Sequence, residues 1–328
     1  MLTKDPPSSR RPPRAIWSRE RLVHDRSVAW GQSIAASTHA AYGSALNSYL
    51  EFTRNHGFPT DPTPDTLSFY ITYTSHYIKP DSVDSYVSGV CHELEPYFPD
   101  VRLSRKSALV KRTMTGCRRM YGSPRRQRRN LTTHDLDSVV SHHHTNPSHD
   151  DKLFCAMLLS GFFALMRLGE LANPDNLKLQ DPRRVIRRSS VEVTPNDYSF
   201  FLPGHKGDRF FDGNTIIIPK NNDRHDPHGH FTSYLLSRDE KFPLLSPLWL
   251  RDDGAIPTRS WFTRRLHRFF DSSVGGHSMR AGGATLLAEL GTPPHLIQAI
   301  GRWKSDAFEA YIRTHPVLIQ ALLFGRHA

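Results

Sequence analysis

The first third of the chain carries apolar residues at three- and four-residue intervals, the spacing of one face of an α-helix. Gly57 ends one such stripe, and Thr63 followed by Pro64 supplies a side-chain cap and a proline suited to the first helical position. The segments with this pattern cover residues 37–56, 63–77, 82–94 and 104–121. We therefore expect an all-helical unit over residues 31–121.

The pattern is mixed after residue 130. Apolar periodicity predicts helices over residues 132–140 and 151–165, and again from Ser260 onward. Between them, β-branched and aromatic runs over residues 191–202 and 216–218 are separated by turn residues, which predicts a small antiparallel sheet. The predicted fold class is mainly α with a small antiparallel β-sheet, an α+β arrangement.

Two segments follow neither period. Residues 1–30 contain two Pro-Pro pairs and scattered arginines, which predicts a flexible arm rich in Pro and Arg. A Gly-Ser-Pro sequence at residues 122–124 breaks the last predicted helix of the first unit, and a basic run extends the break. We therefore expect a basic linker over residues 122–130 and a second domain over residues 131–328.

Composition excludes several classes of protein. The 328 residues are 38% hydrophobic and 23% charged, which is sufficient for two buried cores. No apolar run approaches the ~18 residues that span a bilayer, and the N-terminus lacks the apolar stretch of a secretory signal, so we expect no membrane contact and a protein inside the cell. Cys91, Cys117 and Cys155 form no C-x-x-C pair, which disfavours a disulfide framework. We expect no metal and no cofactor.

The net charge of +11 is concentrated in one segment. Residues 102–130 hold eleven basic residues and no Asp or Glu. This favours a nucleic acid partner over a solvated basic face, and over a membrane surface because large apolar residues do not recur there at helical spacing. The residues that we expect to bind DNA are Arg105, Lys106, Lys111, Arg112, Arg118, Arg119, Arg125, Arg126, Arg128 and Arg129.

Short motifs of the second domain stand in a distinctive order. They place Arg167 in R-x-x-E-L, Lys206 in a Gly-His-Lys-Gly turn between predicted strands, His277 and Arg280 in H-x-x-R, Trp303 in Gly-Arg-Trp, and Tyr311 eight positions later. Each motif alone is weak, because a capping histidine or a core aromatic explains each residue taken singly. Their joint order, in contrast, favours a functional site over these structural explanations.

This order resembles the signature of tyrosine recombinases and phage integrases, and the C-terminal segment is especially similar to Cre recombinase. The resemblance implies a helical core-binding domain of SAM-like type over residues 31–121 and a catalytic domain that breaks and rejoins DNA over residues 131–328. It also implies a site-specific recombinase or integrase that acts on double-stranded DNA without metal or ATP. Such proteins form a dimer per site and a tetramer at synapsis.

The resemblance assigns a role to each motif residue. Tyr311 would attack the scissile phosphate and form a 3′-phosphotyrosyl link, which conserves the energy of the bond. Arg167 and Arg280 would bind the phosphate, because a planar guanidinium matches two phosphate oxygens and keeps its charge. Lys206 would give a proton to the departing 5′ oxygen, since neighbouring arginines lower the pKa of a lysine.

Three further residues complete the expected site. His277 can donate a hydrogen bond or exchange a proton, whereas the indole of Trp303 can only donate. Glu170, one helical turn from Arg167, would orient the site.

Two features depart from the family pattern, and a third concerns assembly. The step from Trp303 to Tyr311 is one residue shorter than in Cre, and Arg302 stands where Cre has a small residue. Residues 316–324 are too apolar to be free in water. The resemblance implies that the tail over residues 316–328 docks on a neighbouring protomer.

The same residues bear on other possible functions. A type IB topoisomerase shares the chemistry, but the Cre-like spacing and the helical unit disfavour it. A catalytically inactive DNA-binding protein derived from a mobile element would have no chemical reason to keep the whole residue set. A serine hydrolase is disfavoured because Arg280 replaces the last glycine of G-x-S-x-G. The histidines at residues 142–144, together with His149, predict a solvated, His-rich loop, with metal binding as the lesser alternative.

The basic linker also bears on location. In a eukaryote it could serve as a nuclear localisation signal, which predicts a nuclear protein. In a prokaryote we expect the protein in the cytoplasm, on the nucleoid. A fungal mobile element is the origin that we expect.

Overall fold

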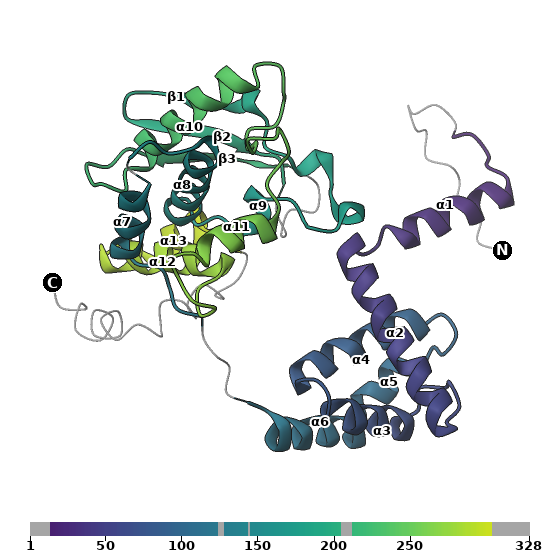
Figure 1. The fold of residues 1–328 in the computed structure, drawn as a ribbon. Coiled ribbons are helices and arrows are strands. Elements are labelled where there is room, and N and C mark those ends of the chain that lie inside the picture. The colour runs from purple at the N-terminus through teal and green to yellow at the C-terminus, as the bar shows by residue number, and fades with distance from the viewer. Residues whose placement is uncertain (1–13, 124–127, 144, 205–211, 304–328) are drawn as a thin grey trace. The chain divides into compact units, whose positions relative to one another are not determined.

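Contacts among its residues divide the chain into two units, Met1–Pro124 (unit 1) and Arg125–Ala328 (unit 2). The computed structural model describes residues 14–123, 128–143, 145–204 and 212–303 (Figure 1). Within these ranges, every helix is too short or too polar to cross a bilayer.

The described part of unit 1 contains only helices. They are α1 (Arg19–Gly31), α2 (Ala36–His56), α3 (Pro64–Ser75), α4 (Pro80–Leu94), α5 (Val101–Lys106) and α6 (Ala108–Tyr121). The apolar faces of α2, α3, α4 and α6 enclose one core, in which Tyr49, Tyr70 and Val90 are completely buried. Gly57 ends α2 in the left-handed conformation, with φ at 69°. The all-helical fold predicted for this unit is confirmed.

Helix α1 lies within residues 1–30, where we predicted a flexible arm. None of its residues is buried. Local contacts hold it instead, because Ser18 accepts a hydrogen bond from the backbone of Arg21, which also pairs with Asp25 at 3.7 Å and lies 4.0 Å from the ring of Trp17. A helix without a buried face has no apolar period, so the prediction needs this correction.

The helix predicted over residues 104–121 is interrupted at Ser107. This residue has extended backbone angles, and its hydroxyl accepts a hydrogen bond from the backbone of Val110 at 3.3 Å. Serine competes with the helix for such bonds and favours a cap. The segment therefore forms α5 and then α6.

Unit 2 combines helices with one sheet. Its helices are α7 (Thr133–His142), α8 (His149–Phe163), α9 (Leu168–Leu171), α10 (Pro227–Lys241), α11 (Arg259–Leu266), α12 (Gly276–Glu289) and α13 (Pro294–Ile300), and its strands are β1 (Glu192–Val193), β2 (Asp197–Leu202) and β3 (Asn214–Pro219). The strands pair antiparallel in the order β1-β2-β3, with Phe200 opposite Ile216. The predicted fold class is confirmed.

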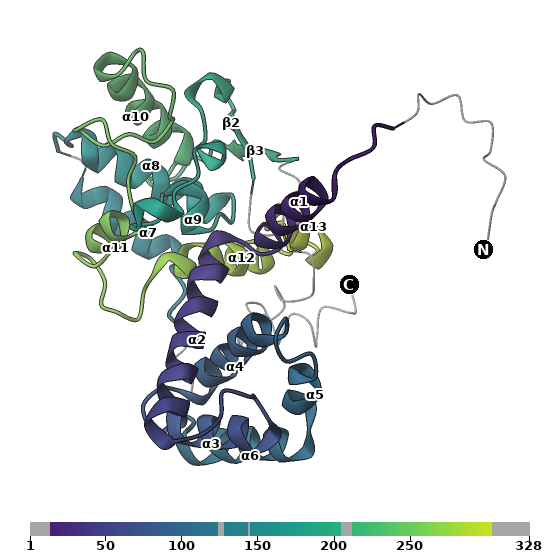
Figure 2. The same ribbon diagram turned by 90° about the vertical axis from the view of Figure 1, so that its right-hand side faces the viewer.

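The core of unit 2 surrounds α8. This helix lies between α10 and α12 in both views (Figure 1 and Figure 2) and contacts both. Every residue from Leu153 to Phe162 is buried, so this part of the helix is covered on all sides, as expected of a central helix. The chain that leaves the C-terminal end of α8 leads directly to Arg167.

Candidate active site

Two glycines let α12 pack closely against the end of α8 and against the segment before α7. A Cβ atom on Gly282 would lie 2.0 Å from the carbonyl oxygen of Leu131, and one on Gly283 would lie 2.0 Å from the carbonyl oxygen of Phe162. Only glycine permits this approach of one backbone to another. The close packing carries Arg280, on the same helix, into the interior of the unit.

Arg280 is 1% exposed, yet its guanidinium is well surrounded by acceptors. It donates hydrogen bonds to the backbone carbonyls of Leu165 and Gly301. Its carbon Cζ also lies 4.1 Å from the centre of the Trp303 ring, a cation–π contact. Trp303 packs in turn against a small apolar cluster of Leu165, Ala284 and Ile297. These contacts fix the guanidinium in one orientation.

Glu170 links the start of α9 to the segment after α13. It accepts hydrogen bonds from the backbone nitrogen of Arg167 at 3.0 Å and from the Arg167 guanidinium at 2.8 Å. The guanidinium of Arg302 donates at 3.1 Å to Oε2, the same oxygen that accepts the backbone N–H of Arg167. Glu170 therefore holds the Arg167 guanidinium and is itself held by Arg302. Its role in orienting a catalytic site stays a prediction.

The charges around Glu170 determine its ionisation. Burial raises the pKa of this carboxyl, but the positive charge of Arg302 and the hydrogen bonds from Arg167 outweigh burial and hold the pKa below its ordinary value. Burial lowers the pKa of Arg302, although an arginine remains charged at neutral pH. The site therefore holds one buried carboxylate between two cations.

His277 lies on the first turn of α12 and is exposed. The hydroxyl of Ser278 accepts a hydrogen bond from the backbone nitrogen of Gly275 at 3.0 Å, which caps this helix end. The helix dipole places partial positive charge at the same end. His277 thus stands at a helix terminus suited to an anion, three residues before Arg280.

The structure brings together Arg167, Glu170, Arg280 and Trp303 from segments far apart in the sequence, and it places His277 on the helix that carries Arg280. Lys206 and Tyr311 lie outside the described residues, as do Arg125, Arg126 and the tail over residues 316–328. The roles predicted for the residues of both groups, described and not described, stay predictions.

Two arginines of the site region were not assigned a role from the sequence. Arg302 was noted only as a departure from the family pattern, and its position between Gly301 and Trp303 was the one available signal. The guanidinium of Arg259, on α11, lies against Gly169 of α9, where an added Cβ atom would be 2.5 Å from its nitrogen. No sequence motif marks Arg259.

The basic segment is more strongly paired than its sequence suggested. Asp84 of α4 binds Arg105 and Arg118, each at 3.0 Å. Arg102 pairs with Glu95 at 2.6 Å and Arg129 pairs with an aspartate of α7 at 2.7 Å. Acidic residues outside the segment therefore neutralise part of it. Within the described ranges, the basic residues of this segment that form no ion pair are Lys106, Lys111, Arg112, Arg119 and Arg128.

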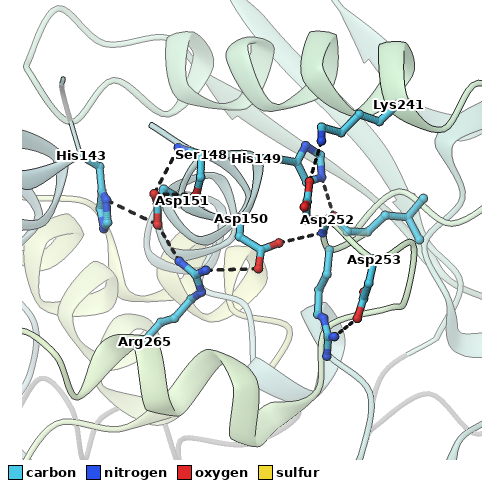
Figure 3. Close-up of polar contacts among 11 residues, drawn as sticks. His143, Ser148, His149, Asp150, Asp151, Lys241, Asp252, Asp253 and Arg265 are labelled. Atoms are coloured by element: carbon cyan, nitrogen blue, oxygen red, sulfur yellow. Dashed lines mark hydrogen bonds and ion pairs between the residues drawn. The ribbon is translucent and has the colours of Figure 1, made fainter. Parts of the chain in front are cut away.

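A second polar cluster, at the start of α8, ties this helix to α11 (Figure 3). Arg265 pairs with Asp150 at 3.2 Å and with Asp151 at 2.6 Å. His143 faces Asp151 at 3.6 Å, and its side chain is 13% exposed. Burial lowers the pKa of His143. His149 is buried as well, and its ring nitrogens lie 2.9 Å from the Ser237 hydroxyl and 2.9 Å from the Leu250 carbonyl oxygen. Neither histidine is part of a solvated loop, which corrects the prediction, and residue 144 lies outside the described residues. The described residues contain no cluster suited to a metal ion.

Comparisons with known proteins give a consistent result. No protein-family model and no curated protein matches the sequence. Among solved structures, the XerH site-specific recombinase bound to palindromic difH substrate matches with a TM-score of 0.61 and 14% identity, over 87% of this chain and 78% of that chain. A lambda integrase tetramer bound to a Holliday junction matches with a TM-score of 0.56 and 15% identity, over 89% and 76%.

A third structure extends the comparison to a transposon protein. The Tn1549 transposon integrase, in complex with circular intermediate DNA, matches with a TM-score of 0.51 and 13% identity, over 87% of this chain and 99% of that chain. At 13–15% sequence identity, the similarity to these structures shows a shared fold only. The chain has the fold of the tyrosine recombinases and integrases.

Proposed function

We propose that this protein is a site-specific DNA recombinase or integrase that breaks and rejoins DNA through a 3′-phosphotyrosyl intermediate. One observation carries the proposal: residues of three separate motifs, in the order expected of a tyrosine recombinase, meet around two oriented guanidinium groups in a unit with that fold. A structural ion pair alone would not require the tryptophan, the exposed helix-start histidine and both arginines together.

The two arginines supply charge for a phosphate. Arg167 is held by Glu170, and 24% of its side chain remains exposed, so it can contact a ligand at the surface of the unit. Arg280 lies deeper, and the carbonyls that it binds keep it from rotating away. Guanidinium groups fixed in advance stabilise the extra charge of a pentacovalent phosphate without reorganisation.

The chemical step needs a nucleophile and an acid. The phenolic oxygen of Tyr311 forms a bond to phosphorus while the bond from phosphorus to the 5′ oxygen breaks, and we propose that His277 accepts the phenolic proton. The leaving oxygen takes a proton, for which we propose Lys206 as donor. Attack of a 5′ hydroxyl on the phosphotyrosine reverses the step, so no ATP is consumed and no metal ion is required.

The basic residues of unit 1 and the solved structures of similar fold support a proposal for the substrate and for the oligomeric state. The exposed, unpaired basic residues of α6 provide contacts for the DNA backbone. Lambda integrase forms a dimer on a core site and a tetramer on a Holliday junction. We propose a dimer of this chain at each DNA site and a tetramer at synapsis, held in part by residues 316–328.

Formation of a covalent adduct tests the proposal. The full-length chain is incubated in EDTA with nicked suicide duplexes cut from genomic DNA of the source, and with supercoiled plasmid. We expect a protein–DNA adduct that survives SDS in the wild type and is absent from Tyr311→Phe. Tyr97→Phe is the control, because this tyrosine is 77% exposed and lies in unit 1.

The outcomes separate the alternatives. An adduct that depends on Tyr311 and appears without recombined product, together with relaxation of single plasmids, would indicate a topoisomerase. DNA binding with a steep salt dependence but no adduct on any substrate would indicate an inactive DNA-binding protein.

A further inference from the structure

Arg302 is a cation whose place in the site the proposed chemistry does not explain. Its φ is 54°, a left-handed conformation that residues with a side chain rarely adopt. Its side chain is only 9% exposed, and its Nε atom is buried without a hydrogen-bond partner. Both features cost free energy, so the position of this guanidinium must be fixed by contacts that compensate.

The first set of contacts leads to Arg167. Arg302 donates to Oε2 of Glu170 at 3.1 Å, and the same oxygen accepts the backbone N–H of Arg167 at 3.0 Å. The other oxygen, Oε1, accepts the guanidinium of Arg167 at 2.8 Å. Arg302 therefore fixes the carboxylate that fixes Arg167.

The second set leads to Arg280. The guanidinium of Arg302 donates to the carbonyls of Ala164 and Leu165, at 3.4 and 3.3 Å. The Leu165 carbonyl also accepts a hydrogen bond from Arg280. Leu165 is itself left-handed, with φ at 49°, and these donors hold its carbonyl in place. Arg302 and Arg280 thus meet at one backbone oxygen.

We propose that Arg302 is a positioning residue that holds Arg167, through Glu170, and Arg280, through the Leu165 carbonyl, in the geometry that binds the scissile phosphate. The inference rests on the proposed function, which it deepens. Arg302 itself does not contact the substrate, because its nitrogens face the interior of the unit. Its neighbour Trp303 stacks on Arg280, so the same short segment fixes that guanidinium from a second side.

The ion pair between Arg302 and Glu170 also implies that the rate of adduct formation depends on pH. The charged groups near Glu170 are Arg167 at the start of α9, Arg302 after α13, Arg259 of α11 against the adjacent glycine, and Arg280 of α12 across the Leu165 carbonyl. Loss of Arg302 removes the interaction that lowers the pKa of Glu170 the most. The carboxyl then protonates at a higher pH and releases Arg167.

Three substitutions separate the possible roles of Arg302 in a single-turnover adduct assay. Arg302→Ala removes the guanidinium, Arg302→Gly also removes the backbone strain, and Arg302→Lys keeps the charge. We expect adduct formation to slow by about 10- to 100-fold for the Ala and Gly variants and by less for the Lys variant, while DNA affinity changes by less than about twofold.

The pH dependence of the rate separates a positioning role from a merely structural one, because a structural role would not change its shape. The rate for Arg302→Ala should fall further between pH 8 and pH 5.5 than the wild-type rate, and Arg302→Lys should restore the wild-type profile. A glycine variant as fast as the wild type would overturn the proposal, because the residue would then serve only the backbone. A loss of rate equal at every pH would overturn it as well.

Sulfate binding distinguishes failure of this inference from failure of the proposed function. Sulfate stays doubly charged over this pH range and carries oxygens like those of a phosphate. By calorimetry on the full-length chain at pH 7.5, we expect affinity to fall about tenfold in Arg302→Ala and in Arg280→Ala, and to be unchanged in Lys178→Ala, an exposed cation elsewhere in unit 2. This result without any adduct would reject the recombinase and retain the positioning role. An equal affinity of Arg302→Ala and the wild type would reject the positioning role.

Discussion

The core of unit 1 and the candidate active site of unit 2 are held together by different forces. In unit 1, apolar faces of four helices enclose Tyr49, Tyr70 and their neighbours, while its ion pairs lie at the surface. In the candidate active site, the fixed elements are a buried carboxylate, three backbone carbonyls and three arginines, joined across α9, α12 and the segment after α13. Apolar burial tolerates small shifts, whereas a polar network loses its energy when one member is missing.

We expect the largest difference between the two regions in the free energy of unfolding that is lost when one acidic residue is removed from each. Glu170→Ala leaves buried guanidinium groups without their anion and should cost about 3–5 kcal/mol in the free energy of unfolding. Asp84→Ala removes the shared partner of Arg105 and Arg118, all of them partly exposed, and should cost about 0–1 kcal/mol. Urea denaturation followed by circular dichroism measures both, and equal losses would remove the distinction between the regions.

Glycine substitutions give the next largest contrast. Gly283→Ala places a Cβ atom 2.0 Å from a carbonyl oxygen of α8 and should destabilise the protein by about 1–3 kcal/mol. Gly116→Ala lies in helix α6 with no atom near the added methyl group, and it should stabilise the protein by about 0.5–1 kcal/mol because alanine favours the helix. The same denaturation experiment compares them, and a neutral Gly283→Ala would mean that α12 can move away from α8.

The pH dependence of stability sharpens the comparison further. Because the pKa of Glu170 is lower in the folded than in the unfolded chain, its contribution is complete above the unfolded value of about 4.3 and disappears as pH falls through the folded value. The difference in unfolding free energy between wild type and Glu170→Gln should therefore be constant from pH 7 to 5.5 and shrink below pH 4.3, by at most about 1.4 kcal/mol per pH unit. A difference that grows on acidification would contradict the lowered pKa.

The difference between apolar burial and polar contacts also explains which features could be predicted from the sequence. Apolar periodicity predicted the helices of unit 1, and β-branched and aromatic runs between turn residues predicted the small sheet of unit 2, because both signals depend on which side chains face a core. It missed α1, which has no buried face, and the interruption at Ser107, where one hydroxyl decides between a helix and a cap. Both depend on single local hydrogen bonds that leave no periodic signal.

The site shows the same limit. The order of motifs identified Arg167, Glu170, Arg280 and Trp303, which the fold brings together. The part played by Arg302 could not be predicted, since it depends on a left-handed backbone and on carbonyls of Ala164 and Leu165 that lie far away in the sequence. Likewise, the charge count of the basic segment could not show that Asp84 of α4 neutralises part of it.

The attachment point of the DNA tests the central claim most directly. Trypsin cleaves after Lys304 and Arg313, so residues 305–313 form one peptide with a single tyrosine, Tyr311. After digestion of the adduct with nuclease and trypsin, we predict a nucleotide remnant on this peptide by mass spectrometry, and a 5′ hydroxyl on the released strand that polynucleotide kinase can label. A remnant on any other peptide, or a protein-blocked 5′ end, would contradict the mechanism.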